Sequence, residues 1–106
     1  MRWLRGAMVG GVIAVAAAPA AAQPADPVEG RRLAAAWCSQ CHVIGDGVAS
    51  GRDVGPPFAA LANDPQKSEA ALRAFLHHPE PPMPPLELST RDIDHLVAYI
   101  RSLARD

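Results

Sequence analysis

The fold of this 106-residue chain follows from one short stretch, Trp37-Cys38-Ser39-Gln40-Cys41-His42. Cys38 and Cys41 are the only cysteines in the sequence, and their spacing places the two thiols about one helical turn apart. His42 follows the second cysteine directly. This C-x-x-C-H order is the attachment signature of haem c, and it predicts a small fold wrapped around that group.

The spacing of the signature has a chemical reason. Two thiols one turn apart can form thioether bonds to the two vinyl groups on one edge of a porphyrin. The histidine that follows is then held beneath the ring, with an imidazole nitrogen directed at the iron. We therefore expect one haem c, bound covalently through thioethers from Cys38 and Cys41, with His42 as an iron ligand.

Three other kinds of site use similar residues. A thioredoxin-like dithiol belongs in a βαβ context, and the sequence has no strand pattern. A disulfide between Cys38 and Cys41 would close a very short loop and stabilise little. A zinc site needs four ligands, so His77 or His78 would have to join the two cysteines and His42. The haem interpretation is favoured over all three.

The N-terminal residues have the layout of a secretory signal peptide. Arg2 and Arg5 form a positively charged start, Gly6–Ala18 is an uncharged apolar run, and Pro19–Ala22 is a small-residue exit. The apolar run is shorter than the about 20 residues that a membrane-spanning helix needs. Cleavage is therefore favoured over a retained anchor that would tether the domain to the inner membrane.

We expect residues 1–22 to be a cleaved signal peptide and residues 23–106 to be the mature domain, which begins at Gln23 and functions in the periplasm. Without the signal, no stable insertion into a membrane is expected.

The composition of the mature domain excludes some functions. It keeps all eleven acidic residues, and of the ten basic residues only Arg2 and Arg5 leave with the signal. This mildly acidic balance gives no support to nucleic-acid binding, which requires a basic patch. Aromatic residues are few: Trp37, Phe58, Phe75 and Tyr99. Because so small a domain buries little apolar surface unaided, we expect the haem to fill its core.

The first helix is predicted over Pro27–Trp37. Asp26 can cap its free N–H groups, Pro27 suits the first helical position, and Glu29 can reach back to the cap. The glycine-rich residues 43–55 are predicted to form a loop, and Gly55–Phe58 a rigid corner.

A second helix is predicted to open at Asp64-Pro65 and to end before Pro79, because a residue that precedes proline disfavours the helical region. Its apolar stripe consists of Ala71, Leu72, Phe75 and Leu76. The proline-rich segment 79–85 can be neither helix nor sheet interior.

The last helix has the strongest signals. Ser89 with Asp92 three residues later forms a capping box, and Leu88 with Ile93 can form a hydrophobic staple. The apolar face consists of Ile93, Leu96, Val97, Ile100 and Leu103. On the polar side, His95 is expected to face solvent. The predicted fold class is all-α, with three main helices around one haem and one or two short helices besides.

The sixth iron ligand can be inferred from what the mature domain retains. Met1 and Met8 leave with the signal, so Met83 is the only methionine left. The prolines that flank it make a stiff segment, which lowers the entropy lost when its thioether is held against iron. His77 or His78 would give bis-histidine haem instead. Met83 is favoured, because both histidines lie at a helix end before a proline rather than in the rigid loop.

Taken together, these residues resemble the class I cytochromes c, in particular small periplasmic bacterial members with one haem. The resemblance covers nearly all of the mature domain. It implies that Gly30 allows the first helix to cross the last one closely, at Leu96 and Tyr99. It also implies that the carbonyl of Pro56 accepts a hydrogen bond from the haem-ligating histidine, and that Met83 lies in the methionine-ligand loop. One departure is Ala34, where the family often has an aromatic residue.

The resemblance implies a one-electron carrier with His/Met ligation, not an enzyme, that works as a monomer and meets separate redox partner proteins. Two alternatives remain. The chain could be a haem subunit of a larger dehydrogenase or oxidase complex, or a ligand-binding haem sensor whose iron keeps one position open.

Overall fold

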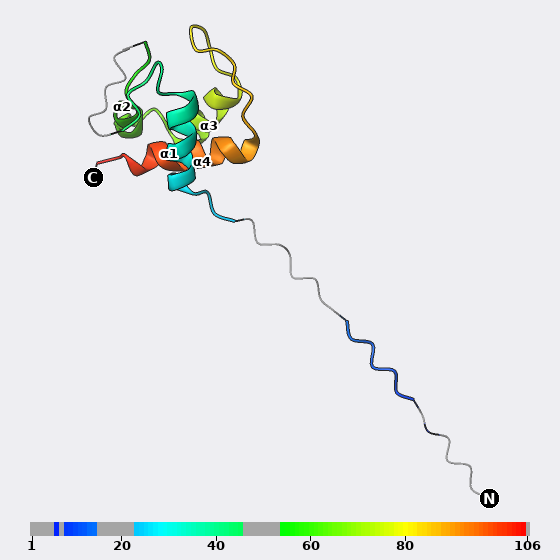
Figure 1. Cartoon of the computed structure of the whole chain (residues 1–106). Coiled ribbons are helices and arrows are strands. Elements are labelled where there is room, and N and C mark those ends of the chain that lie inside the picture. The colour runs from blue at the N-terminus through cyan, green and yellow to red at the C-terminus, as the bar shows by residue number, and fades with distance from the viewer. Residues whose placement is uncertain (1–5, 7, 15–22, 46–53, 106) are drawn as a thin grey trace, which may run out of the picture.

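Four helices make up the regular structure in the computed structural model, which describes residues 6, 8–14, 23–45 and 54–105. They are α1 (Pro27–Trp37), α2 (Phe58–Asn63), α3 (Glu69–His77) and α4 (Thr90–Ser102), shown in Figure 1. No strand occurs within these described ranges. The predicted class is thus confirmed as all-α, with three longer helices and one short one.

The structure describes only part of the predicted signal peptide. Residues 8–14 have no regular secondary structure, and the expected cleavage point after Ala22 lies outside the described residues. Among the residues that are described, no helix is long and apolar enough to cross a membrane.

The N-terminal caps of α1 and α4 were predicted correctly. A carboxylate oxygen of Asp26 accepts a hydrogen bond from the backbone N–H of Val28 at 2.9 Å. At α4 both halves of the capping box are present, since Ser89 Oγ accepts from the N–H of Asp92 at 3.0 Å and Asp92 Oδ2 accepts from the N–H of Ser89 at 3.2 Å. Each cap satisfies helix N–H groups that would otherwise lack partners.

Two expectations at the start of α1 were wrong. Glu29 does not reach back to the cap, because its carboxylate binds the guanidinium of Arg32 one turn later. The N–H of Asp26 instead donates to Nδ1 of His95 at 2.8 Å. His95 is therefore half-buried and ties the start of α1 to α4, rather than simply facing solvent.

The helix predicted to open at Asp64-Pro65 begins later, at Glu69. Asp64 Oδ1 accepts from the N–H of Gln66 at 2.9 Å, and the Asp64 carbonyl accepts from the N–H of Lys67 at 3.0 Å. These bonds form a turn, since an aspartate can cap a turn as readily as a helix. Ser68 is the actual cap, and its hydroxyl accepts from the N–H of Ala71. The predicted end before Pro79 is correct.

The closest helix contact is the crossing of α1 and α4 at Gly30. A methyl group added there would lie 2.7 Å from Cβ of Tyr99 and would collide with the backbone carbonyl of His95. Side chains never approach that closely, so only glycine permits this crossing. Tyr99 was correctly predicted as a crossing partner, and the backbone carbonyl of His95 is a further one. Leu96, the other expected partner, is buried in the core that α1 and α4 share.

The hydrophobic core lies along α4. Its largest fully buried side chains are Ile93, Leu96 and Val97. Leu33 of α1, Phe58 of α2 and Leu72 of α3 pack into the same cluster. Leu88, predicted as one half of the staple, packs against this cluster. The core thus fixes α1 on α4, and with it the position of the residues that follow α1.

Candidate cofactor site

The C-x-x-C-H segment forms a single turn at the end of α1. The N–H of Cys38 still bonds to the carbonyl of Ala34 at 2.8 Å, and the N–H groups of Cys41 and His42 both bond to the carbonyl of Cys38, at 3.2 and 3.0 Å. The hydroxyl of Ser39 donates to the carbonyl of Ala35. The helix therefore passes into a turn that carries both thiols and the imidazole.

Both cysteines are free thiols in this structure. Burial raises the pKa of Cys38 to about 11, and the neighbouring Cys41 adds to the effect. Cys38 is consequently protonated at neutral pH, whereas a thioredoxin-like site depends on a thiolate of lowered pKa. Among the described residues, no group of even three His, Cys, Asp or Glu side chains is placed to hold a metal ion, and a structural zinc site needs four ligands.

The imidazole of His42 has a defined orientation. Its Nδ1 lies 2.7 Å from the carbonyl oxygen of Pro56. Because a carbonyl can only accept, Nδ1 carries the proton in the neutral ring, and the lone pair belongs to Nε2. An imidazole with one nitrogen fixed by a backbone carbonyl is the usual arrangement of a metal-ligating histidine.

Two further residues pack around this ring. A methyl group added at Gly55 would lie 2.7 Å from both Nδ1 and Nε2 of His42, so the imidazole occupies the space that a side chain would take. The ring of Phe58 lies with its centroid 5.3 Å from that of His42. Sequence reasoning identified these residues as a rigid corner and missed their contact with His42. The pair Gly55-Pro56 was the sequence signal from which this contact could have been predicted.

Backbone hydrogen bonds hold the corner against the C-x-x-C-H turn. The N–H of Gly55 donates to the carbonyl of Cys41 at 2.9 Å, and the N–H of Phe58 donates to the carbonyl of Val43 at the same distance. Further along, the hydroxyl of Tyr99 donates to the carbonyl of Ile44 at 2.6 Å. The residues after His42 are therefore fastened both to the corner and to α4.

Met83 lies in the loop between α3 and α4. It is half-buried, and its N–H bonds to the carbonyl of Glu80 at 3.1 Å, which closes a turn. In Figure 1 this loop, drawn in yellow, projects at the same end of the molecule as the turn that follows α1. His77 and His78 are exposed at the end of α3. The choice among these residues as iron ligand stays a prediction.

The donor set fits a covalently attached haem. Cys38 and Cys41 offer two thiols on one turn, and His42 offers an imidazole whose orientation is fixed by Pro56 and whose space is left by Gly55. Those three donors would hold the group, and the half-buried Met83 offers a thioether from a different segment.

The sequence also matches known proteins. The family model described as cytochrome c oxidase, cbb3-type, subunit III matches residues 25–100. Cytochrome c-552 of Bradyrhizobium diazoefficiens is 40% identical over 92 residues, which cover 87% of this chain and 88% of that relative. No solved structure matches the chain significantly. The matched region contains the C-x-x-C-H turn, the Gly55–Phe58 corner and the Met83 loop.

Proposed function

The chain belongs to the cytochrome c family, which binds haem c and carries electrons, and on that basis we propose that it is a periplasmic one-electron carrier with His42 and Met83 as axial ligands. Bound haem supplies iron that alternates between the ferric and ferrous states. The protein holds that group, orients the ligands and limits access to the iron. In this proposal the signal peptide, residues 1–22, delivers the domain to the periplasm.

The observation that carries the proposal is the hydrogen bond between His42 Nδ1 and the carbonyl of Pro56. It fixes the tautomer with the proton on Nδ1, so that Nε2 is the nitrogen that would bind the iron. Gly55 supports the same orientation from the side, because the ring lies against its α-carbon. A ligand that is fixed before and after electron transfer needs little rearrangement when the charge on the iron changes.

Met83 supports the carrier function over a catalytic one. If its thioether fills the sixth position, external molecules have no open site on the iron, and only electrons are exchanged. Thioether ligation also raises the reduction potential relative to a second histidine. Met83 is suited to this by its half-buried position and by a turn that anchors its own backbone to Glu80.

Replacement of each ligand candidate tests the proposal. Met83→Ala should abolish the weak far-red absorption band of methionine-ligated ferric haem, admit carbon monoxide to the ferrous protein and lower the potential. Haem attachment should persist, since it depends on Cys38 and Cys41. His77→Ala and His78→Ala are the matched controls and should leave band and potential nearly unchanged.

Two results would contradict the proposal. If the band survives in Met83→Ala and is lost with either histidine, a histidine is the ligand. If the wild-type ferrous protein binds carbon monoxide readily at neutral pH, the sixth position is open and a sensor replaces the carrier.

A second candidate function is that of a haem subunit in a larger oxidase, because the matching family model is described as an oxidase subunit. The cytochrome c-552 relative, matched over most of its own length, favours the separate carrier. Size-exclusion chromatography of the native periplasmic fraction distinguishes them. A carrier should elute as a small monomer that transfers electrons to added periplasmic proteins, whereas a subunit should elute with a complex.

A further inference from the structure

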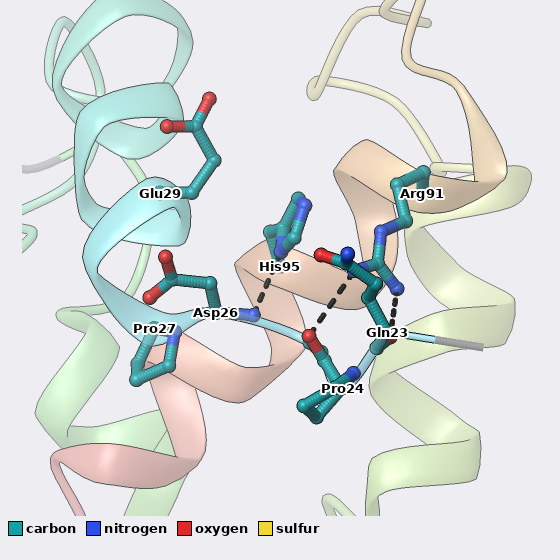
Figure 2. A pocket seen from close by; sticks show the side chains of 8 residues that line it. Gln23, Pro24, Asp26, Pro27, Glu29, Arg91 and His95 are labelled. Atoms are coloured by element: carbon teal, nitrogen blue, oxygen red, sulfur yellow. Dashed lines mark hydrogen bonds between the residues drawn. The ribbon is translucent and has the colours of Figure 1, made fainter. Parts of the chain in front are cut away.

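The first residues of the predicted mature domain are bound to one face of α4. The guanidinium of Arg91 donates to two successive backbone carbonyls, to Gln23 at 2.6 Å and to Pro24 at 3.1 Å. One turn later, His95 accepts from the N–H of Asp26 at 2.8 Å. Figure 2 shows all three hydrogen bonds. Arg91 and His95, spaced four residues apart, thus form a clamp for this segment.

The clamp lines a pocket at the opposite end of α1 from Cys38, so the pocket is no part of the cofactor site. Its lining residues are Gln23, Pro24, Ala25, Asp26, Pro27, Glu29, Arg91 and His95. Two carboxylates also line it. Asp26 accepts from the N–H of Val28 and keeps its charge, whereas the charge of Glu29 is offset by Arg32. Arg91 is the charged group in direct contact with Gln23.

Cleavage after Ala22 changes what Arg91 faces. The new α-amine belongs to Gln23, whose own carbonyl is already bound to the guanidinium. Backbone dimensions place that amine within roughly 6 Å of the guanidinium. A like charge at this distance disfavours the ammonium form. The clamp therefore accommodates an uncharged N-terminus better than a charged one.

We propose that Gln23 is a modification site, which closes to a pyroglutamyl residue that Arg91 and His95 hold against α4. The inference rests on the signal cleavage in the proposed function. In the reaction the unprotonated α-nitrogen attacks Cδ of the Gln23 side chain, an N–C bond forms, the bond from Cδ to the amide nitrogen breaks, and ammonia leaves with the proton from the amine. The exposed side chain of Gln23 is accessible for ring closure. The lactam is neutral, and the carbonyls of Gln23 and Pro24 remain for Arg91.

Mass spectrometry of the exported holoprotein tests the modification. The expected N-terminal peptide begins at Gln23, is lighter by one ammonia than its sequence requires, and resists Edman degradation until pyroglutamyl aminopeptidase removes the first residue. A free Gln23 amine on a haem-bearing protein would overturn the inference and leave the proposed function standing. A mature chain that starts at another residue would overturn the inference and the proposed cleavage after Ala22, but not the proposed electron carrier. Absence of haem would instead overturn the proposed function.

Denaturation of the holoprotein tests the clamp. Gln23→Asn keeps the backbone carbonyl but cannot close, because its shorter side chain would need a four-membered ring. With its ammonium beside Arg91, this variant should have a roughly three- to tenfold smaller folding equilibrium constant at low salt, and the loss should shrink at high salt. In an Arg91→Gln background the Asn substitution should have little effect. In an Arg31→Gln background, which makes the same change of net charge on exposed α1, the loss should remain. An equal loss in both backgrounds would overturn the role of Arg91.

Discussion

At the scale of single residues, the orientation of His42 depends on a neutral partner. The carbonyl of Pro56 fixes the tautomer of the imidazole without adding a charge beside it. A carboxylate in that place would make the ring more basic and favour ferric iron more strongly. A carbonyl partner, together with the proposed thioether ligand Met83, would suit a carrier of comparatively high potential.

Gly55→Ala should disturb this arrangement specifically. The added methyl group would lie 2.7 Å from both imidazole nitrogens, so either the ring or the corner must move. We expect a loss of about 1–3 kcal/mol in the free energy of unfolding, together with a changed haem spectrum and a shifted potential, measured by denaturation and by redox titration.

Gly45→Ala is the matched control, because a methyl group there would meet the hydroxyl of Tyr99, at 2.9 Å, instead of His42. It should lower stability while leaving the haem spectrum unchanged. If Gly55→Ala also leaves spectrum and potential unchanged, Gly55 has no part in orienting His42.

Tyr99→Phe isolates one hydrogen bond. The phenol hydroxyl donates to the carbonyl of Ile44 in a partly buried position, and it connects α4 to the residues just after His42. Its loss leaves that carbonyl without this partner and should cost about 1–2 kcal/mol. Denaturant titration of the holoprotein measures the cost, and an unchanged midpoint would show that water replaces the hydroxyl fully.

At the scale of helices, what the sequence predicts depends on how local the signal is. The starts of α1 and α4 were predicted because each cap and its N–H partner are two or three residues apart. The start of α3 was missed because Asp64 has the same local options in a helix and in a turn. The role of His95 was missed because its partner, Asp26, is 69 residues away.

The residues of the cofactor site also differ in how local their sequence signal is. Cys38, Cys41 and His42 form a contiguous motif, so their presence on one turn could be predicted from spacing alone. The contact of Gly55 with His42 depends on a corner folding back by hydrogen bonds to Cys41 and Val43. No periodicity or propensity reports such a contact.

Gly30→Ala should show that close crossing outweighs helix propensity. Alanine is intrinsically better in a helix by about 1 kcal/mol, but its methyl group would collide with the His95 carbonyl and the Tyr99 side chain. Because both helices are fixed by the core, we expect a net loss of about 1–3 kcal/mol or more. The same change in reverse at an exposed position of α1, Ala36→Gly, should cost only about 1 kcal/mol. A Gly30→Ala protein that is more stable than wild type would show that α1 and α4 can move apart at little cost in free energy.

At the scale of the whole molecule, α4 is the common packing partner. Within the described residues, α1, α2 and α3 each pack against α4, and none of these three helices packs against another. The largest fully buried side chains accordingly lie on α4, at Ile93, Leu96 and Val97. The other helices carry partly exposed aromatic side chains, with Trp37 at 51% and Phe75 at 42% of their surface accessible. Because α1, α2 and α3 pack on α4 and not on one another, we expect the fold to depend on the haem for its stability.

The expected dependence on haem can be tested by removing its two attachment residues. Replacing Cys38 and Cys41 together by alanine removes both thioethers, so the haem is no longer retained by covalent bonds. A ligand that binds only the folded state stabilises that state, and without it a domain of this size buries too little apolar surface to stay folded. We expect the double variant to lose most of its helical circular dichroism at room temperature and to show no cooperative thermal transition.

The matched control is Ser39→Ala, which lies between the two cysteines and keeps both of them. It removes only a hydroxyl bond to Ala35, so it should stay folded with its haem attached. Because α4 has a complete capping box of its own, the residual helicity of the double variant should come mainly from that helix. A double variant that melts cooperatively with near-native helicity would show that packing on α4 is enough to keep the domain folded and that the haem is not required for the fold.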